Sequence, residues 1–133
     1  MHQFHYVGNK LSCEGVALDS LVKKFGTPLY VYDLATVRQQ CELALASFRA
    51  EHADTDVLYA SKAFLNRPFA RFVASEGFGF DAVSGGEIAT LHAAGVDLSR
   101  VYLHGNNKAP WELRLAVESG LGRIVIDGEW EIE

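Results

Sequence analysis

Apolar and polar positions in the second half of the chain repeat with a short, regular period. Apolar runs of four to six residues recur, and amphipathic segments of helical spacing separate them. Strands are therefore predicted at residues 57–61, 78–83, 100–104 and 123–127. Equivalent positions in these strands, 22 or 23 residues apart, are Tyr59, Asp81, Leu103 and Ile126. Strands that alternate with helices on such a period favour a parallel sheet with right-handed crossovers.

Three helices are predicted between these strands. Pro68 and Pro110 lie near the start of the first and third helix, where proline is well tolerated. Gly77, Gly95 and Gly120 follow the three helices, at the place where a C-terminal glycine belongs. The predicted fold class is α/β. A doubly wound sheet and a (β/α) barrel both fit this pattern, and the regularity of the spacing favours the barrel.

The beginning of the chain follows a different pattern. Two short strands are predicted near residues 4–7 and 11–13, and an amphipathic helix that ends at Gly26 follows them. A compact strand is then predicted at residues 29–32. Asp33 is a suitable N-cap for the longer amphipathic helix that comes next.

The length of the chain limits how much of a barrel it can form. A complete (β/α)8 barrel needs about 250 residues, and this chain has 133. We therefore expect a truncated barrel of about four βα units over residues 34–133, with an open sheet edge. Residues 1–33 are expected to supply N-terminal strands and a connecting helix that belong to a β-domain.

Composition excludes several classes of protein. The chain is 49% apolar and 22% charged, with a net charge of −5, so no nucleic-acid partner is expected. No apolar run approaches the roughly 20 residues of a membrane span, and the N-terminus lacks the apolar core of a signal peptide. Cys13 and Cys41 fit neither a metal motif nor a disulfide framework. We expect reduced thiols, no metal site and a cytoplasmic location.

Polar residues lie at the ends of the predicted strands, which is the edge where barrel enzymes carry out chemistry. Lys62 follows the first strand, where partial desolvation would free its amine as a nucleophile toward a carbonyl. Its alternative role is that of a surface lysine with its ammonium group in water. Asp81 lies inside the second strand, where it either balances the charge of Lys62 or bonds to neighbouring backbone.

Two further sites at this edge have weaker signals. Ser84 and Glu87 belong to a glycine-containing turn at the start of a helix, which could bind an anion or simply cap the helix. His104 follows the third strand and could donate to a ligand, although a lone histidine in a loop more often has no such role.

Three segments in the expected order resemble one family of enzymes. Residues 59–63, Tyr-Ala-Ser-Lys-Ala, resemble the Tyr-Ala-x-Lys-Ala motif of the alanine-racemase-like, barrel-type decarboxylases that depend on pyridoxal phosphate. Residues 80–87 are similar to the second strand and turn of that family. Residues 104–108, His-Gly-Asn-Asn-Lys, resemble the third-strand signature of the branch that acts on diaminopimelate. The opening 32 residues are similar as well, while Phe64 stands where many members have Asn.

This resemblance implies a cofactor and a set of roles. Lys62 would hold pyridoxal phosphate covalently, Asp81 would lie near the bond, and Glu87, with Ser84 and His104 as further candidates, would support the same region. The implied reaction is decarboxylation of a small amino acid, meso-diaminopimelate, to lysine in a homodimeric enzyme.

The resemblance leaves alternatives open. Related members act on arginine, ornithine or carboxynorspermidine, or are racemases. The family's phosphate-binding loop and C-terminal β-domain would lie in later segments, so this chain is expected to be inactive alone. It could also be a non-catalytic folding or interaction unit.

Overall fold

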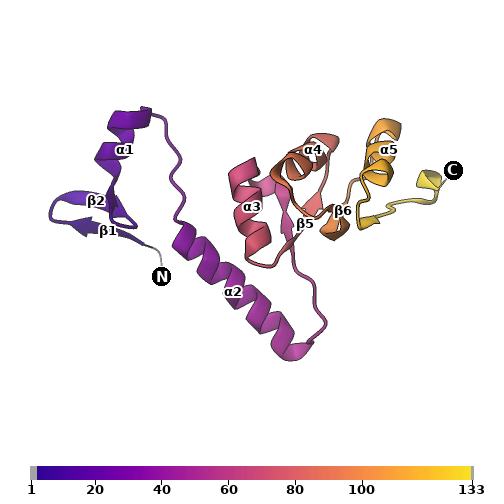
Figure 1. The fold of residues 1–133 in the computed structure, drawn as a ribbon, viewed down its shortest axis with the longest axis horizontal. Coiled ribbons are helices and arrows are strands. Elements are labelled where there is room, and N and C mark those ends of the chain that lie inside the picture. Colours follow the sequence, from indigo (N-terminus) through magenta and orange to yellow (C-terminus); the bar gives the residue numbers. More distant parts are fainter. Residues whose placement is uncertain (1–2, 133) are drawn as a thin grey trace. The chain divides into compact units, whose positions relative to one another are not determined.

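The computed structural model describes residues 3–132 of the chain, which pack as two compact units divided after residue 50. Figure 1 shows the elements of both units. Those of the first are β1 (Phe4–Val7), β2 (Lys10–Cys13), β3 (Val16–Ala17), α1 (Leu18–Phe25) and α2 (Leu34–Glu51). The predicted assignment of residues 1–33 to a β-domain and of 34–133 to a barrel remains a prediction.

The first unit is built on a small antiparallel sheet in the order β1-β2-β3. Its first turn contains Gly8, whose φ of 62° lies in the left-handed region that glycine adopts readily. The two predicted strands and both predicted helices are present. The strand predicted at residues 29–32 is wrong: this segment pairs with no strand among the described residues. Without a partner, β-propensity alone does not make a strand.

Helix α2 begins where the sequence predicted, because Asp33 caps it. The Asp33 carboxylate accepts hydrogen bonds from the backbone N–H and the hydroxyl of Thr36 and from the backbone N–H of Gln3. Burial alone would raise the pKa of Asp33, but these hydrogen bonds outweigh it and hold the pKa well below its usual range. Burial, followed by the charges of Asp33 and Glu14, raises the pKa of the Cys13 thiol, which therefore stays protonated.

The second unit contains four parallel strands and the helices between them. Its strands are β4 (Leu58–Ala60), β5 (Gly79–Ala82), β6 (Val101–Leu103) and β7 (Arg123–Ile124). Its α-helices are α3 (Arg67–Ser75), α4 (Gly85–Ala94) and α5 (Pro110–Glu118). Its 3-10 helices are η1 (Ser61–Ala63), η2 (Leu98–Arg100) and η3 (Glu129–Glu131). The expected alternation is confirmed, although each strand is shorter than its apolar run.

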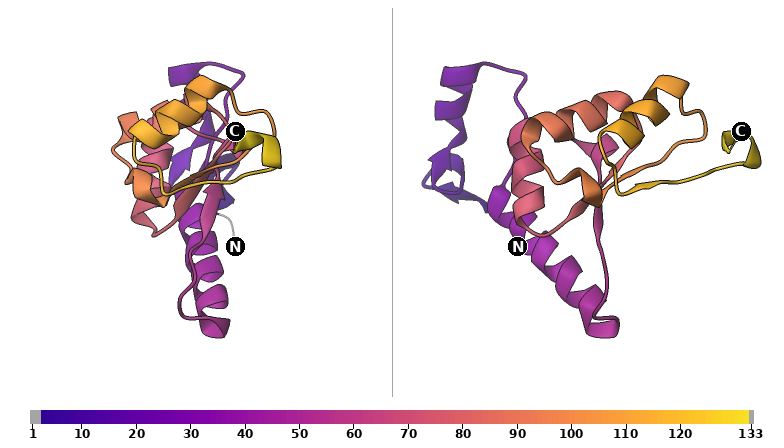
Figure 2. Two further views of the ribbon diagram at one scale, coloured as in Figure 1. Left: turned by 90° about the vertical axis from the view of Figure 1, so that its right-hand side faces the viewer. Right: turned by 45° about the vertical axis from the view of Figure 1, so that its right-hand side comes forward.

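The strand order decides between the two architectures that the sequence left open. The order is β4-β5-β6-β7, with each strand beside the next in the chain, and α3, α4 and α5 lie along one face of this sheet (Figure 2). A doubly wound sheet reverses its strand order and carries helices on both faces. Sequential order with helices on one face is the arrangement of a (β/α) barrel.

The core of the second unit lies between the sheet and these helices. Phe80 of β5 is fully buried, as are Ile88 and Leu91 of α4. Tyr59 of β4 meets Phe80 edge to face, with ring centroids 6.2 Å apart. The helix-covered face is therefore apolar and closely packed.

The strand register differs by one residue from the predicted equivalence of Tyr59 and Asp81. Tyr59 pairs with Phe80, whereas Asp81 pairs with Ala60 on one side and with Tyr102 on the other. The repeat along the sheet is thus shorter by one residue than the apolar runs suggested. Because neighbouring side chains on a strand point to opposite faces, this shift moves Asp81 to the face opposite Tyr59 and the helices.

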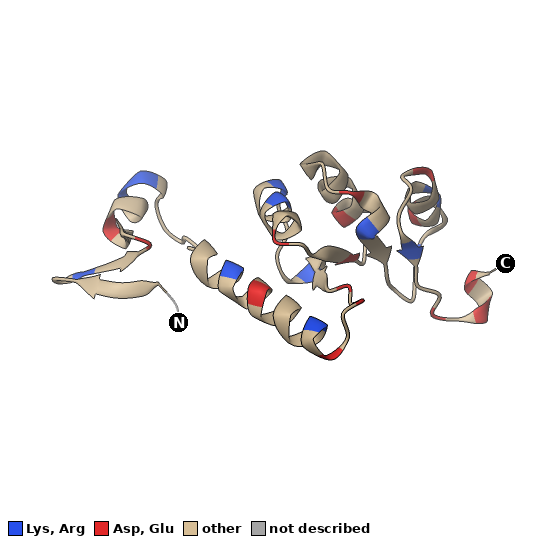
Figure 3. Cartoon of the chain, turned by 60° about the horizontal axis from the view of Figure 1, so that its bottom comes forward, with Lys and Arg blue, Asp and Glu red and all other residues tan. Residues whose placement is uncertain are grey.

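The chain carries 12 basic and 17 acidic residues. Basic and acidic residues are interspersed along both units (Figure 3). No helix within residues 3–132 combines the length and the apolar character that crossing a membrane requires.

Candidate functional site

The carboxyl ends of the parallel strands bring the predicted site residues to one edge of the sheet. Lys62 lies in η1, directly after β4, and Ser84 and His104 follow β5 and β6. Asp81 is the third residue of β5, in register with Ala60, two residues before Lys62. Lys62 and Asp81 therefore come from adjacent strands, as the sequence predicted.

Asp81 is the polar residue at this edge whose surroundings are most unusual. Its Oδ1 atom is buried and accepts no hydrogen bond from residues 3–132. Nε2 of His104 lies 3.5 Å from this oxygen, which is within ion-pair range when the imidazole is protonated but is long for a hydrogen bond. A buried carboxylate oxygen without a hydrogen bond is costly. Asp81 is therefore suited to receive a positively charged group.

Lys62 is the candidate for that group. Its side chain is exposed and makes no hydrogen bond or ion pair with the described residues. The partial burial expected from the sequence is therefore not formed by residues 3–132. The Ser61 hydroxyl beside it is buried, and its oxygen has no hydrogen-bond partner within the same range. This edge of the sheet combines the exposed amine of Lys62 with two buried oxygens that have no hydrogen bond within the described residues, that of Ser61 in η1 and Oδ1 of Asp81 in β5.

Ser84 and Glu87 cap the start of α4. The Ser84 hydroxyl oxygen accepts a hydrogen bond from the N–H of Glu87 at 3.3 Å, and Glu87 Oε2 accepts one from the N–H of Val83 at 2.7 Å. The N–H of Gly85 donates to Oε1 of Glu112 at 2.8 Å. Three amides of this turn thus already have side-chain acceptors, which favours the capping role over anion binding.

Glu112 is not among the residues predicted from the sequence. Its second carboxylate oxygen accepts a hydrogen bond from the N–H of Ala109 at 2.9 Å, so one side chain ties the start of α5 to the start of α4. An acidic residue two positions after Pro110 was a visible signal for helix capping. Its reach to α4 depends on the packing of the two helices, which the sequence does not reveal.

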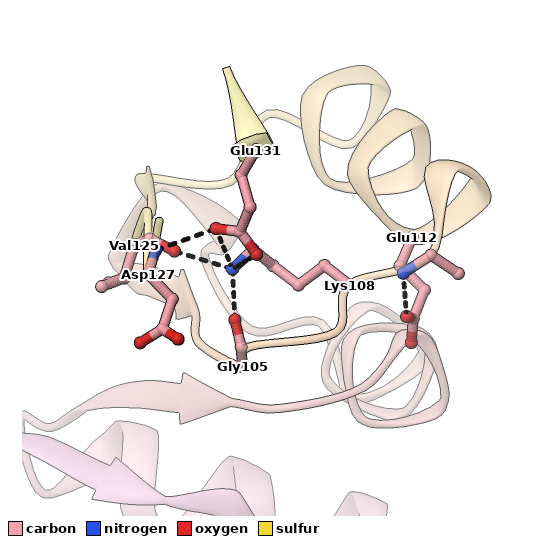
Figure 4. Close-up of polar contacts among 7 residues, drawn as sticks. Gly105, Lys108, Glu112, Val125, Asp127 and Glu131 are labelled. Carbon is pink, nitrogen blue, oxygen red and sulfur yellow. Dashed lines mark hydrogen bonds and ion pairs between the residues drawn. The ribbon is translucent and has the colours of Figure 1, made fainter. Parts of the chain in front are cut away.

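Lys108 and Glu131 form a buried ion pair that was also missed (Figure 4). Lys108 Nζ lies 2.9 Å from Glu131 Oε1, and the two side chains are 2% and 8% exposed. Such low exposure distinguishes this pair from the solvated pairs of the surface. The hydrogen bond from Lys108, then that from the N–H of Asp127, lowers the pKa of Glu131 below its ordinary 4.5.

This lowered pKa predicts a structural change in acid. A carboxyl group whose pKa is lower in the folded state than in the unfolded state stabilises the fold when the pH is above its unfolded-state pKa. This stabilisation is lost as the pH falls through the folded-state pKa. As the pH falls below 4.5, we expect the Asp127 amide to lose its acceptor, visible as a shift of its NMR signal. Glu131→Gln should remove this transition, and an unchanged transition in that variant would contradict the assignment.

The fold and this strand edge define the class of protein. Residues 34–133 match the family model described as "Pyridoxal-dependent decarboxylase, pyridoxal binding domain", and the chain belongs to this family. The cofactor of the family is pyridoxal 5'-phosphate, and its members are PLP-dependent enzymes, as expected from the motifs at residues 59–63 and 80–87.

Individual relatives show which enzymes within this family the chain resembles. It is 43% identical over 122 residues to the diaminopimelate decarboxylase of Bacillus subtilis (strain 168), and 41% identical over 119 residues to that of Mycobacterium tuberculosis (strain ATCC 25618 / H37Rv). These alignments cover 92% and 90% of this chain but 28% and 26% of the relatives. The chain thus spans little more than a quarter of their length.

Solved structures agree with the fold. The chain resembles the diaminopimelate decarboxylase from M. jannaschii in co-complex with L-lysine, with a TM-score of 0.86 and 26% identity over 98% of this chain and 31% of that one. It also resembles the lysine/ornithine decarboxylase complexed with putrescine from Vibrio vulnificus, with a TM-score of 0.74 and 25% identity over 86% of this chain and 31% of that one. The predicted partial barrel preceded by antiparallel strands is confirmed.

Proposed function

We propose that the protein to which this chain belongs decarboxylates meso-diaminopimelate to L-lysine, with pyridoxal phosphate held by Lys62. One observation carries the proposal: in a chain of the pyridoxal-binding family, Lys62 directly follows the parallel strand β4, at the edge where Asp81 of the adjacent strand β5 has a buried carboxylate oxygen without a hydrogen bond. The relatives from B. subtilis and M. tuberculosis are named for diaminopimelate decarboxylation, which supports this choice of substrate.

The residues at the strand edge fit the cofactor. Lys62 offers an amine that the described residues leave unpaired, and an amine condenses with the aldehyde of pyridoxal phosphate. The Asp81 oxygen, buried and without a hydrogen bond, supplies negative charge on the adjacent strand. Pyridoxal phosphate supplies an electron sink for the carbanion that remains when carbon dioxide leaves.

The residues of this chain have distinct roles in that reaction. Lys62 would hold the cofactor through its amine. Asp81 would supply negative charge near the bound cofactor, and His104, which follows β6 and approaches Asp81 Oδ1 to 3.5 Å, would help to hold that carboxylate in place. Ser84 and Glu87 act indirectly, because their side chains fix the turn that follows Asp81. The complete enzyme is a homodimer in this proposal.

A second candidate is decarboxylation of lysine or ornithine. The resemblance to the V. vulnificus lysine/ornithine decarboxylase favours it, although at 25% identity against 43% for the B. subtilis relative. Both candidates share Lys62 as the cofactor-bearing residue and differ in residues that select the substrate. The two candidates therefore differ only in the substrate, and both place the cofactor on Lys62.

The test uses a joined enzyme, in which residues 1–133 of this chain replace the matching part of the B. subtilis diaminopimelate decarboxylase. With pyridoxal phosphate, it is expected to release carbon dioxide from meso-diaminopimelate, with little release from lysine, ornithine or arginine. A joined enzyme that binds the cofactor but prefers one of the other amino acids would overturn the proposed substrate.

Residues 1–133 alone are expected to give no measurable turnover in the same assay. Orientation of reacting groups is worth about 7–11 kcal/mol of barrier, and three amides around the start of α4, those of Val83, Gly85 and Glu87, are engaged in capping. Turnover by the isolated chain at the rate of a full-length relative would show that it contains the whole catalytic apparatus.

A further inference from the structure

Lys108 is a buried cation in the loop between β6 and α5. Its Nζ donates hydrogen bonds to the carbonyl oxygen of Gly105, to that of Val125 at 2.8 Å, and to Glu131 Oε2 at 2.9 Å (Figure 4). An ammonium group has three donors, so all of them are used. The partners come from the segments that follow β6 and β7, and the single side chain therefore joins the ends of two neighbouring strands.

One of these contacts, that to Gly105, and one backbone hydrogen bond bear on His104, the residue before Gly105. The N–H of His104 donates to the carbonyl oxygen of Ala82 at 2.8 Å, and Lys108 holds the carbonyl oxygen of Gly105. Backbone groups on both sides of the His104 side chain are thus fixed. Gly105 has a φ of 124°, a conformation that side chains rarely allow, so the direction of the loop is set at this residue.

The His104 side chain itself has little else to hold it. It is 44% exposed, and its contact with the rest of the site is the 3.5 Å approach of Nε2 to Asp81 Oδ1. The direction of the ring therefore depends on the backbone of the loop.

We propose that Lys108 is a positioning residue, with Glu131 as its counter-ion, that clamps the 104–108 loop and thereby directs His104 at the buried oxygen of Asp81. Glu131 completes the clamp because a cation that is 2% exposed needs a compensating charge. It also accepts a hydrogen bond from the N–H of Asp127 at 2.9 Å, which anchors it to the segment after β7. The importance of His104 and Asp81 for a cofactor rests on the proposed function, whereas the clamp itself does not.

The clamp can be tested by NMR on the 133-residue chain without cofactor. A nuclear Overhauser cross-peak is expected between the His104 ring protons and the Asp81 β-protons. Lys108→Met keeps the bulk of the side chain and removes the ammonium group, and it should abolish this cross-peak. Exchange of the Asp127 amide should also accelerate by about tenfold or more, as expected when the charged carboxylate loses its cation and its fixed place.

Two matched controls separate the clamp from a general loss of charge. Arg114→Met removes an exposed cation of α5, and Glu129→Gln removes an exposed carboxylate of η3; both should retain the cross-peak. Glu131→Gln leaves an oxygen acceptor but no charge, and it should weaken the cross-peak while the amides of α4 keep their protection. This comparison distinguishes displacement of His104 from unfolding.

An unchanged cross-peak in Lys108→Met would overturn the proposal. If that variant does not fold, Glu131→Gln is the deciding variant, and an unchanged cross-peak in it would overturn the proposal. This test does not depend on Lys62. If the clamp behaves as stated but Lys62 takes up no cofactor, the role of Lys108 stands and the proposed function is wrong.

Discussion

Lys62→Ala is expected to abolish turnover of the joined enzyme, with kcat/KM lower by about a thousandfold or more, as is found when a residue that forms a covalent intermediate is removed. The reason is chemical, because alanine has no amine to hold the cofactor in place. The measurement is carbon dioxide release from meso-diaminopimelate. The fold should persist, since the Lys62 side chain is exposed and makes no polar contact with the described residues.

Two variants test whether turnover depends on the amine of Lys62 or only on its positive charge. Lys62→Arg keeps a positive charge at this strand edge but offers a guanidinium group that remains protonated, so it should be as inactive as Lys62→Ala. Lys10→Ala removes an exposed lysine of β2 and should retain full activity. Substantial turnover by either Lys62 variant would refute the role proposed for this residue.

Phe80→Ala is expected to destabilise the second unit by about 3–5 kcal/mol, the range for truncating a buried phenylalanine. Phe80 is fully buried in β5 and contacts the ring of Tyr59. Alanine would therefore leave a cavity between the sheet and its helices. Because many domains have a total stability of only about 5–15 kcal/mol, the variant should unfold at much lower denaturant concentration.

Hydrogen exchange of amides in β5 and α4 measures this loss within the second unit. The matched control is Val117→Ala on α5, a residue that is 71% exposed. It should change the stability by no more than about 0.5 kcal/mol. Equal effects of the two substitutions would mean that Phe80 does not belong to the core that the structure describes.

The architecture of the second unit could be predicted from the sequence because its signals are local. Apolar runs bounded by glycine and proline indicated each strand and helix, and Gly95 adopts the left-handed conformation expected at the end of α4. The register could not be predicted in the same way. Apolar runs show roughly where a strand lies, whereas pairing depends on contacts between strands, and the one-residue difference moved Asp81 to the other face from Tyr59.

The candidate site was predictable to the extent that it lies in short motifs. The positions of Lys62, Asp81 and His104 at one edge follow from strand ends that meet in a parallel sheet. The buried pair of Lys108 and Glu131 could not be found this way. The two residues are 23 positions apart and lie in different loops, and both residue types are usually exposed.

Reductive trapping tests the central claim most directly. The joined enzyme is loaded with pyridoxal phosphate, reduced with borohydride and digested, and the modified lysine is identified by mass spectrometry. We predict the pyridoxyl label on the peptide that contains Lys62, and its absence from that peptide in Lys62→Arg. A label on Lys108 or another lysine, with Lys62 unmodified, would contradict the account.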